Sequence, residues 1–419
     1  MKRNYFIVVL IFLIFFVISF LTNILGPLIP DIINSFSLSL TLAGLLPFSF
    51  FVAYGVMSIP AGILVEKYRE KPILLASFIV ALTGSVLFAT VPRFGVALFS
   101  LFFIGIGMAM LQVAINPLLR VAGGEPHFAF NSVLAQLIFG LASFLSPQIY
   151  TYLVLNLKDY SGGGNVIVRS LAEVVPRHLP WVSLYWVFAF VTLVMVLVIA
   201  AVRLPKVERK EDEKAGAWAT YRKLLRNRTV PLFFLGIFAY VGSEQGVANW
   251  ISKFLSSYHG FDPQTTGADT VSYFWGLLTA GCLLGLLLLK FLDSRLVLIV
   301  FTSGALVFLT LALFGSGRAA VIAFPLVGFF ASVMWSVIFS LALNSVESHH
   351  GAYSGILCTA IIGGAVVPLI IGWLGDLFGL RIGMMFLYLT LGYILIIGFW
   401  AKPLISNATI SLKRKRAAS

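Results

Sequence analysis

The sequence predicts an all-α membrane protein in which twelve transmembrane helices form two pseudo-symmetric halves of six. Three observations lead to this class. The 419 residues are 60% hydrophobic and only 11% charged, a composition that soluble domains of this length do not have. Apolar segments of about 20 residues or more, enough to span a bilayer, follow one another along the chain. The first half of the chain is also repeated in the second.

Twelve apolar segments are expected to form the membrane helices. They cover residues 5–34, 41–65, 72–91, 94–120, 128–155, 181–203, 229–257, 270–291, 295–315, 318–346, 352–378 and 382–402. The first segment follows Lys2 and Arg3 and imitates a signal peptide. It is long enough to span the bilayer and shows no clear small-residue cleavage site, so we keep it as the first helix.

The internal repeat defines the halves. A shift of 223 residues places Gly62 on Gly285 and Lys67 on Lys290, each at the end of the second helix of its half. Glycine there permits close helix approach, and a neighbouring Lys or Arg can bond the carbonyl end of another helix. We therefore predict an N-terminal half over 1–203, a linker over 204–228, a C-terminal half over 229–404 and a basic tail over 405–419.

The basic residues predict the orientation. If the helices alternate in direction, one side of the membrane receives 22 of the 29 Lys and Arg residues, including those of both termini and the linker. By the positive-inside rule this side is cytoplasmic, in a plasma (inner) membrane. The net charge of +13 is thus a topology signal, and the expected partner is the lipid bilayer rather than nucleic acid. We expect the loops that carry Gly62, Lys67 and Arg69, and Gly285 and Lys290, to act as cytoplasmic gates.

Two segments outside the membrane are expected to contain short helices. In the linker, residues 217–225 read AWATYRKLL, which suits an amphipathic helix on the inner membrane surface. In the outer segment 158–180, the stretch VIVRSLAEVV suits an interfacial helix. We expect the linker to act as a tether between the halves and the outer segment to serve in packing.

Polar residues one turn apart within the apolar segments predict a binding site, because such rows face protein or a cavity rather than lipid. Amides both donate and accept hydrogen bonds, and aromatic rings cover the C–H face of a sugar, so a neutral polyhydroxylated ligand is indicated. Interhelical hydrogen bonding is the alternative role for each amide. Candidate substrate-binding residues are Asn23, Gln112, Asn116, Gln136, Tyr240, Gln245, Asn249, Trp250, Trp335 and Asn344. We expect one cavity near the bilayer midplane to be lined by Gln112, Asn116, Gln136, Gln245, Asn249 and Asn344.

Glu244 is the one carboxylate that we place deep in the membrane. An ionised carboxylate there costs several kcal/mol, roughly 2.5 to more than 3 on insertion scales, so it needs a donor, water or a cation. Tyr240 lies one turn earlier and can donate. We expect Glu244 to bind the driving ion, a proton or alternatively sodium; the other reading is a structural carboxylate in an uncoupled transporter. Asp31 and Asp376 are expected near the outer surface and solvated.

Three motifs resemble the fucose–galactose/glucose–proton symporter family of the major facilitator superfamily. PAGILVEKY is similar to its second-helix motif, LQVAINPLL to its fourth-helix motif, and YVGSEQGVANWISKFL to its seventh-helix motif. The resemblance implies import of a neutral hexose, deoxyhexose or amino sugar by alternating access, with matches at Gln136, Glu244 and Asn344. The acidic positions of fucose-type members are occupied here by Gly26 and Gln112.

Other functions are less favoured by the residues. An exporter of amphiphilic compounds would have fewer amides in its cavity. A membrane enzyme needs a nucleophile and base, paired carboxylates or a metal cluster at depth, whereas the five His lie in loops or helix ends, including His349 and His350. We expect no enzyme activity, no cofactor, no metal and no disulfide, since Cys282 and Cys358 both lie in apolar segments. A monomer is expected.

Overall fold

The computed structural model describes residues 4–124, 128–158, 160, 162, 165–205, 218–402 and 404, and the regular structure in these ranges is helical. Twelve stretches of the described residues are long and apolar enough to cross a membrane. This confirms the predicted fold class. Most of the expected linker (206–217) and the tail from 405 onward lie outside the described residues.

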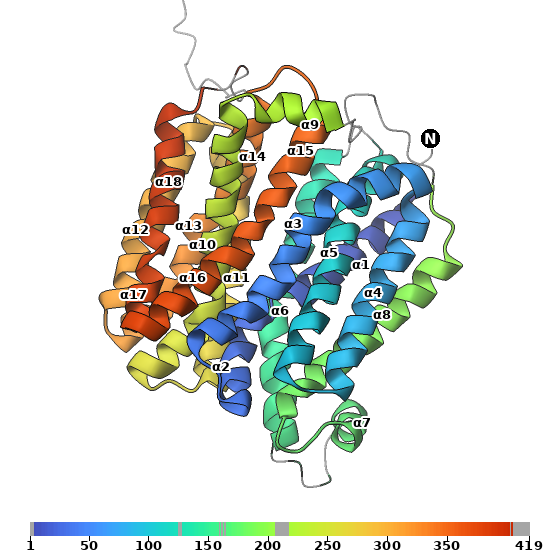
Figure 1. Ribbon diagram of the computed structural model, residues 1–419, viewed down its shortest axis with the longest axis vertical. Helices are drawn as coiled ribbons and strands as arrows, with labels where there is room; N and C mark the ends of the chain where they lie inside the picture. The colour runs from blue at the N-terminus through green and yellow to red at the C-terminus, as the bar shows by residue number, and fades with distance from the viewer. Residues whose placement is uncertain are drawn as a thin grey trace, which may run out of the picture.

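The helices form two groups that lie side by side (Figure 1). The first group contains α1 (Tyr5–Thr22), α2 (Leu25–Phe36), α3 (Leu40–Tyr68), α4 (Glu70–Thr90), α5 (Phe94–Gly123), α6 (Phe128–Lys158), α7 (Val166–Val174) and α8 (Ser183–Ala201). The second contains α10 (Thr229–His259), η4 (Pro263–Gly267), α11 (Ala268–Leu288), α12 (Ser294–Phe314), α13 (Gly317–Ala331), α14 (Met334–Leu343), α15 (His350–Thr359), η5 (Ala360–Ile362), α16 (Gly363–Phe378), α17 (Leu380–Met385) and α18 (Leu387–Trp400).

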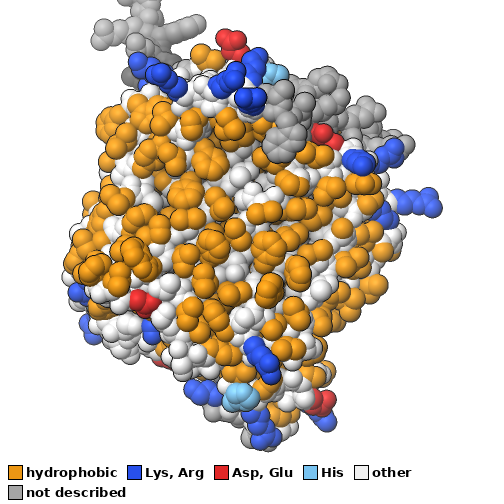
Figure 2. Space-filling view, viewed as in Figure 1, with side chains coloured by type: hydrophobic (Ala, Val, Ile, Leu, Met, Phe, Trp, Pro, Cys, Tyr) orange, Lys and Arg blue, Asp and Glu red, His pale blue; other side chains and the backbone are white. Residues whose placement is uncertain are grey.

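The two ends of the bundle differ. A short helix, α9 (Trp218–Leu225), crosses one end, which we call the linker end; α7 lies at the other, which we call the far end (Figure 1). Both short helices fall where the sequence predicts them. Hydrophobic side chains cover the middle of the visible face, and Lys and Arg gather toward the ends (Figure 2). This distribution fits a bundle whose middle faces lipid.

Local residue choices explain where several helices begin and end. Ser39, Asp293 and Ser316 each cap a helix N-terminus, because the side-chain oxygen accepts a hydrogen bond from a backbone N–H of the first turn. Gly260 ends α10 in the left-handed conformation, with φ +69°, which glycine adopts without strain.

Four of the expected spans are interrupted rather than continuous. The first divides into α1 and α2 around Asn23 and Ile24. Pro27 lacks the N–H that would bond the carbonyl of Asn23 four residues earlier, so the helix opens there. The tenth, eleventh and twelfth spans divide at α13/α14, at η5 and at α17/α18. Breaks of this kind inside a membrane bundle leave backbone groups for neighbouring helices or a ligand.

The internal repeat is visible in the hydrogen bonds of the linker end. Lys71 Nζ donates to the carbonyl oxygens of Ala200 and Val202, each at 2.8 Å, at the end of α8. In the second half, Arg295 Nη1 donates to the carbonyl of Ala401, at 3.5 Å, just after α18. Each half thus ties a basic residue after its second span to the carboxyl end of its sixth. A cation at a helix C-terminus also interacts favourably with the helix dipole.

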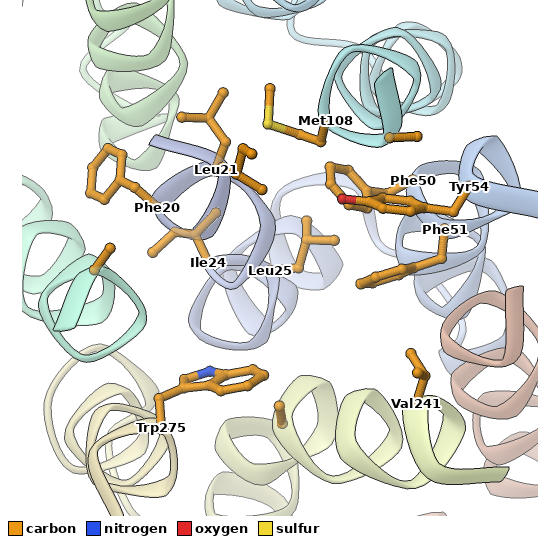
Figure 3. Packing of buried hydrophobic residues seen from close by; sticks show 14 of the residues in the cluster. Phe20, Leu21, Ile24, Leu25, Phe50, Phe51, Tyr54, Met108, Val241 and Trp275 are labelled. Carbon is orange, nitrogen blue, oxygen red and sulfur yellow. The ribbon is translucent and has the colours of Figure 1, made fainter. Parts of the chain in front are cut away.

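Buried apolar side chains fill the middle of the bundle, including the boundary between the groups. In Figure 3, Ile24 and Leu25 lie between aromatic residues of α3, such as Phe51, and Val241 and Trp275 of the second group. The break in the first span is therefore packed between both halves. This position places Asn23, the residue at the break, next to α10.

Candidate functional site

A chain of buried amides joins the two halves. Asn249 Nδ2 donates to Gln245 Oε1 at 3.4 Å, and Gln245 Nε2 donates to Asn23 Oδ1 at 3.5 Å. Asn23 Nδ2 in turn donates to Ser143 Oγ at 2.8 Å. The three amides are at most 5% exposed. The contacts of 3.4 and 3.5 Å are at the long limit for hydrogen bonds, so these amides are only loosely satisfied by one another.

Glycine permits this close approach of the halves. A Cβ atom on Gly26 of α2 would lie 2.3 Å from the carbonyl oxygen of Ala248, which is on α10 between Gln245 and Asn249. A Cβ on Gly364 of α16 would meet Phe51 of the first half at 3.0 Å and Gln245 at 3.2 Å. Larger residues at these two positions would separate the helices that carry the amides.

Glu244 is held by its own helix. Tyr240 Oη donates to Glu244 Oε1 at 2.7 Å, one turn apart on α10 as the spacing predicts. The Tyr240 ring is buried, and its centroid lies 6.2 Å from that of Trp335 on α14. The carboxylate therefore has the neutral Tyr240 hydroxyl as a donor beside an aromatic pair, an arrangement able to accept a proton or to offer oxygen atoms to a small cation.

The other predicted amides lie apart from this chain. Asn116 Nδ2 donates to the backbone carbonyl of Gln112 at 3.2 Å, so in this state it serves its own helix, α5. Gln136 is exposed on α6, nearer the linker end. The structure thus brings together Asn23, Gln245 and Asn249. The side chains of Gln112, Asn116 and Gln136 lie on other helices, α5 and α6, and remain candidates.

Two candidates need correction. Trp250 is 0% exposed, and its indole N–H donates to the carbonyl of Pro368 on α16 at 3.1 Å, so this ring packs the second half instead of facing a site. Asn344 does not lie near the midplane, because it is the C-cap residue of α14 at the linker end. Its carbonyl accepts from the backbone N–H of Leu404 at 2.7 Å.

The predicted gate residues lie at the linker end. Lys67 is in the last turn of α3, with Nζ 5.1 Å from the Tyr68 ring centroid, and Arg69 adopts φ +69° between α3 and α4. Gly62 is half-buried on α3, and Lys290 is exposed after α11. Gly285 is buried where a Cβ would lie 2.2 Å from Val333, within the second half. Gating by these residues remains a prediction.

A carboxylate beside this end has a clear charge partner. Asp293 Oδ1 accepts from Arg295 Nε at 3.2 Å, and Oδ2 accepts from Arg295 Nη2 at 3.3 Å. The guanidinium holds the pKa of Asp293 below its usual range. This pair stiffens the turn that places Arg295 against the end of α18.

Sequence reasoning missed several polar residues. Asp31 was expected to be solvated but is only 8% exposed, because Tyr150 and Gln264 cover it and donate to it. Ser19 was not singled out, although it lies one turn before Asn23 and its Oγ is 2.6 Å from Ser143 Oγ. That one-turn spacing was the available signal. Among the described residues, no three His, Cys, Asp or Glu side chains gather as a metal site.

Comparisons with known proteins agree with this architecture. Residues 11–361 match the model of the Major Facilitator Superfamily. The chain is 33% identical over 411 residues to a glucose/galactose transporter of Brucella abortus, covering 95% of this chain and 94% of that protein. It is 25% identical over 380 residues to the L-fucose-proton symporter of Escherichia coli, covering 87% and 86% of the two chains.

A solved structure shares the fold. The crystal structure of the Escherichia coli fucose:proton symporter superposes with a TM-score of 0.69 at 22% identity, covering 96% of this chain and 100% of the other. The two sequence relatives are described as transporters, and neither is described as an enzyme. With its twelve spans and a family match over most of its length, this chain belongs to the major facilitator superfamily, as a transporter and not an enzyme.

Proposed function

We propose that this protein imports a neutral monosaccharide by alternating access, with the sugar bound between the halves. The observation that carries the proposal is the buried amide chain of Asn23, Gln245 and Asn249, which crosses the boundary between the halves. Its contacts are long, so a ring of hydroxyl groups placed among these amides would offer shorter hydrogen bonds. A ligand that contacts both halves can influence the opening of both ends of the bundle.

The relatives support a sugar as the substrate class. Two of them are described as a glucose/galactose transporter and an L-fucose-proton symporter. Hexoses and deoxyhexoses of this kind are neutral and rich in hydroxyl groups. Amides suit them better than charged groups would, because amides donate and accept at once. Tyr240, on the same helix as Gln245 and Asn249, and Trp335 of α14 supply aromatic surface.

We propose that Glu244 links the sugar to a driving ion, with a proton as the favoured ion. Coupling requires a group whose charge differs between loaded and empty states, and a buried carboxylate that accepts a hydrogen bond from the neutral Tyr240 hydroxyl is such a group. Sodium bound by the carboxylate and Tyr240 oxygens is the alternative ion. An uncoupled transporter is the remaining outcome, in which Glu244 only fixes α10.

We further propose that the linker end faces the cytoplasm, with the protein in the plasma (inner) membrane. The support is the distribution of charge in the sequence, since alternation of the helices assigns 22 of the 29 Lys and Arg residues to this side. In this orientation the far end is the outer end. The structure then corresponds to a state in which the outer ends of the two halves touch.

Binding and uptake of sugars test the proposal. Purified protein is screened by thermal shift with neutral monosaccharides, since a ligand of the folded state raises the melting temperature. Gln245→Ala should lose the shift, while Asn156→Ala, exposed near the far end of α6 and bonded to the Tyr152 carbonyl of its own helix, should keep it. Stabilisation by hydrophobic amines but by none of the sugars would favour an exporter of amphiphilic compounds instead.

A further inference from the structure

The far end is closed by a carboxylate of one half that caps a helix of the other. Asp376 of α16 accepts from the backbone N–H groups of Leu40 and Thr41, each at 2.8 Å, and from Thr41 Oγ1 at 2.5 Å. These residues form the first turn of α3, where Ser39 also accepts from the N–H of Leu42. A helix N-terminus has unpaired N–H groups and a partial positive charge, both of which a carboxylate satisfies.

Two further aspartates bridge the halves at the same end. Asp31 of α2 accepts from Gln264 Nε2, at 3.0 Å to Oδ1 and 3.3 Å to Oδ2, and from Tyr150 of its own half at 2.5 Å. Asp269, in the first turn of α11, accepts from Gln148 Nε2 of α6 at 2.9 Å. In all three bridges the donor from the opposite half is uncharged.

The backbones at this end are too close for anything larger than glycine. A Cβ on Gly372 of α16 would lie 2.4 Å from the carbonyl oxygen of Leu40, the residue whose N–H Asp376 binds. A Cβ on Gly44 would lie 3.0 Å from the Cα of Leu369. The Asp376 bridge and these contacts therefore lie along one line where α3 packs against α16.

We propose that Asp31, Asp269 and Asp376 are the gate residues of the far end, holding it shut through hydrogen bonds to uncharged donors of the opposite half. When the halves part at this end, α3 loses the cap that Asp376 supplies, and Asp31 loses Gln264 but keeps Tyr150. The gate depends on hydrogen-bond geometry rather than on ion pairs. The inference assumes the alternating access of the proposed function but not its sugar.

Cysteine accessibility tests the gate without any substrate. In a background with Cys282→Ala and Cys358→Ala, Val271→Cys reports on the far end, since Val271 is buried and faces Gly26 of the other half. In a separate protein, Ser340→Cys, exposed on α14, reports on the linker-end half of its span. Purified protein in detergent reacts with a water-soluble maleimide, so both ends are reached.

Asp376→Asn and Gln264→Leu should each raise the labelling rate at Val271→Cys by about tenfold, the size expected when hydrogen bonds to a charged group are lost. Labelling at Ser340→Cys should fall in the same variants. The matched control is Asp262→Asn at the same end, because Asp262 accepts from Gln264 N and Thr265 Oγ1 of its own half. Asp262→Asn should leave both rates within about twofold of the parent.

Two results would overturn the gate. Unchanged labelling at Val271→Cys in Asp376→Asn and Gln264→Leu would show that these bridges do not hold the end shut. A rise at both reporters together would show that the residues hold the fold rather than one gate. Neither result bears on whether sugars bind, so a failed sugar screen and a failed gate remain distinguishable.

Discussion

Replacing Gly26 with alanine should specifically weaken the state in which the far end is closed. The new Cβ would lie 2.3 Å from the backbone carbonyl oxygen of Ala248, so α2 and α10 would have to separate by about 1 Å to restore van der Waals contact. A backbone atom cannot rotate aside as a side chain can. Overpacking of this kind costs about 1–3 kcal/mol. A cost borne by one state alone changes the ratio of two states about 5- to 150-fold.

Two other glycines provide controls. A Cβ on Gly95 meets nothing within 4 Å, so Gly95→Ala should be neutral or slightly stabilising through helix propensity. A Cβ on Gly105 would lie 2.2 Å from the carbonyl oxygen of Phe50, a contact inside the first half, so Gly105→Ala should lower thermal stability without favouring either end.

The assays are thermal unfolding of the purified variants and maleimide labelling at Val271→Cys. Gly26→Ala should unfold at a lower temperature than the parent and label faster at the far end. Gly105→Ala should share only the first effect. If Gly26→Ala matches Gly95→Ala in both assays, then α2 and α10 do not approach as closely as we describe, and the reasoning fails.

Three further predictions concern transport. Glu244→Gln should retain sugar exchange in proteoliposomes but lose accumulation driven by a proton or sodium gradient; accumulation that survives would exclude Glu244 as the coupling group. Asn249→Ala should raise the KM for uptake about tenfold, because an unpaired buried polar group costs about 1–3 kcal/mol, and an unchanged KM would remove it from the site. Lys67→Ala and Lys290→Ala should favour the state open at the linker end, which labelling at Ser340→Cys would detect as a faster rate; an unchanged rate in both would count against this clamp.

Hydropathy and charge were enough to predict the spans because lipid imposes a length and a composition on each helix. The periodicity of the α-helix was also enough to pair Tyr240 with Glu244, since the two residues lie one turn apart on one helix. The spacing of residues along a helix indicates on which face a side chain lies, but not which other helix packs against that face. Trp250 shares α10 with the amides, yet its contact is the carbonyl of Pro368, far away in sequence.

The depth at which a residue lies in the bundle was also not predictable from the sequence. Asp31 is eight residues beyond the break at Asn23 and was expected to be solvated, because it lies near the end of its span. Its burial depends on Gln264, which arrives from the opposite half. Asn344 was placed too deep for the reverse reason, since the helix that carries it ends one residue earlier, at Leu343.

The proposed sugar site and the far-end gate are connected by the contact between α2 and α10, so we expect them to be thermodynamically linked. The short helix α2 begins just after Asn23, rests on Ala248 through Gly26 and carries Asp31, while α10 carries Gln245 and Asn249. Because the first span is broken before α2, this helix can move against α10 separately from α1.

A sugar held between Asn23 and Gln245 therefore binds best when α2 lies against α10. A ligand that favours one state must lose apparent affinity as that state becomes rarer, in proportion to its remaining population. Asp376→Asn, remote from the amides, should thus weaken sugar binding: if the closed state falls to about a tenth of the molecules, the apparent Kd should rise about tenfold. Titration of purified protein with the sugar that stabilises it measures this. An unchanged Kd alongside far-end labelling that has become tenfold faster would mean that the sugar does not distinguish the two states, and that site and gate are independent.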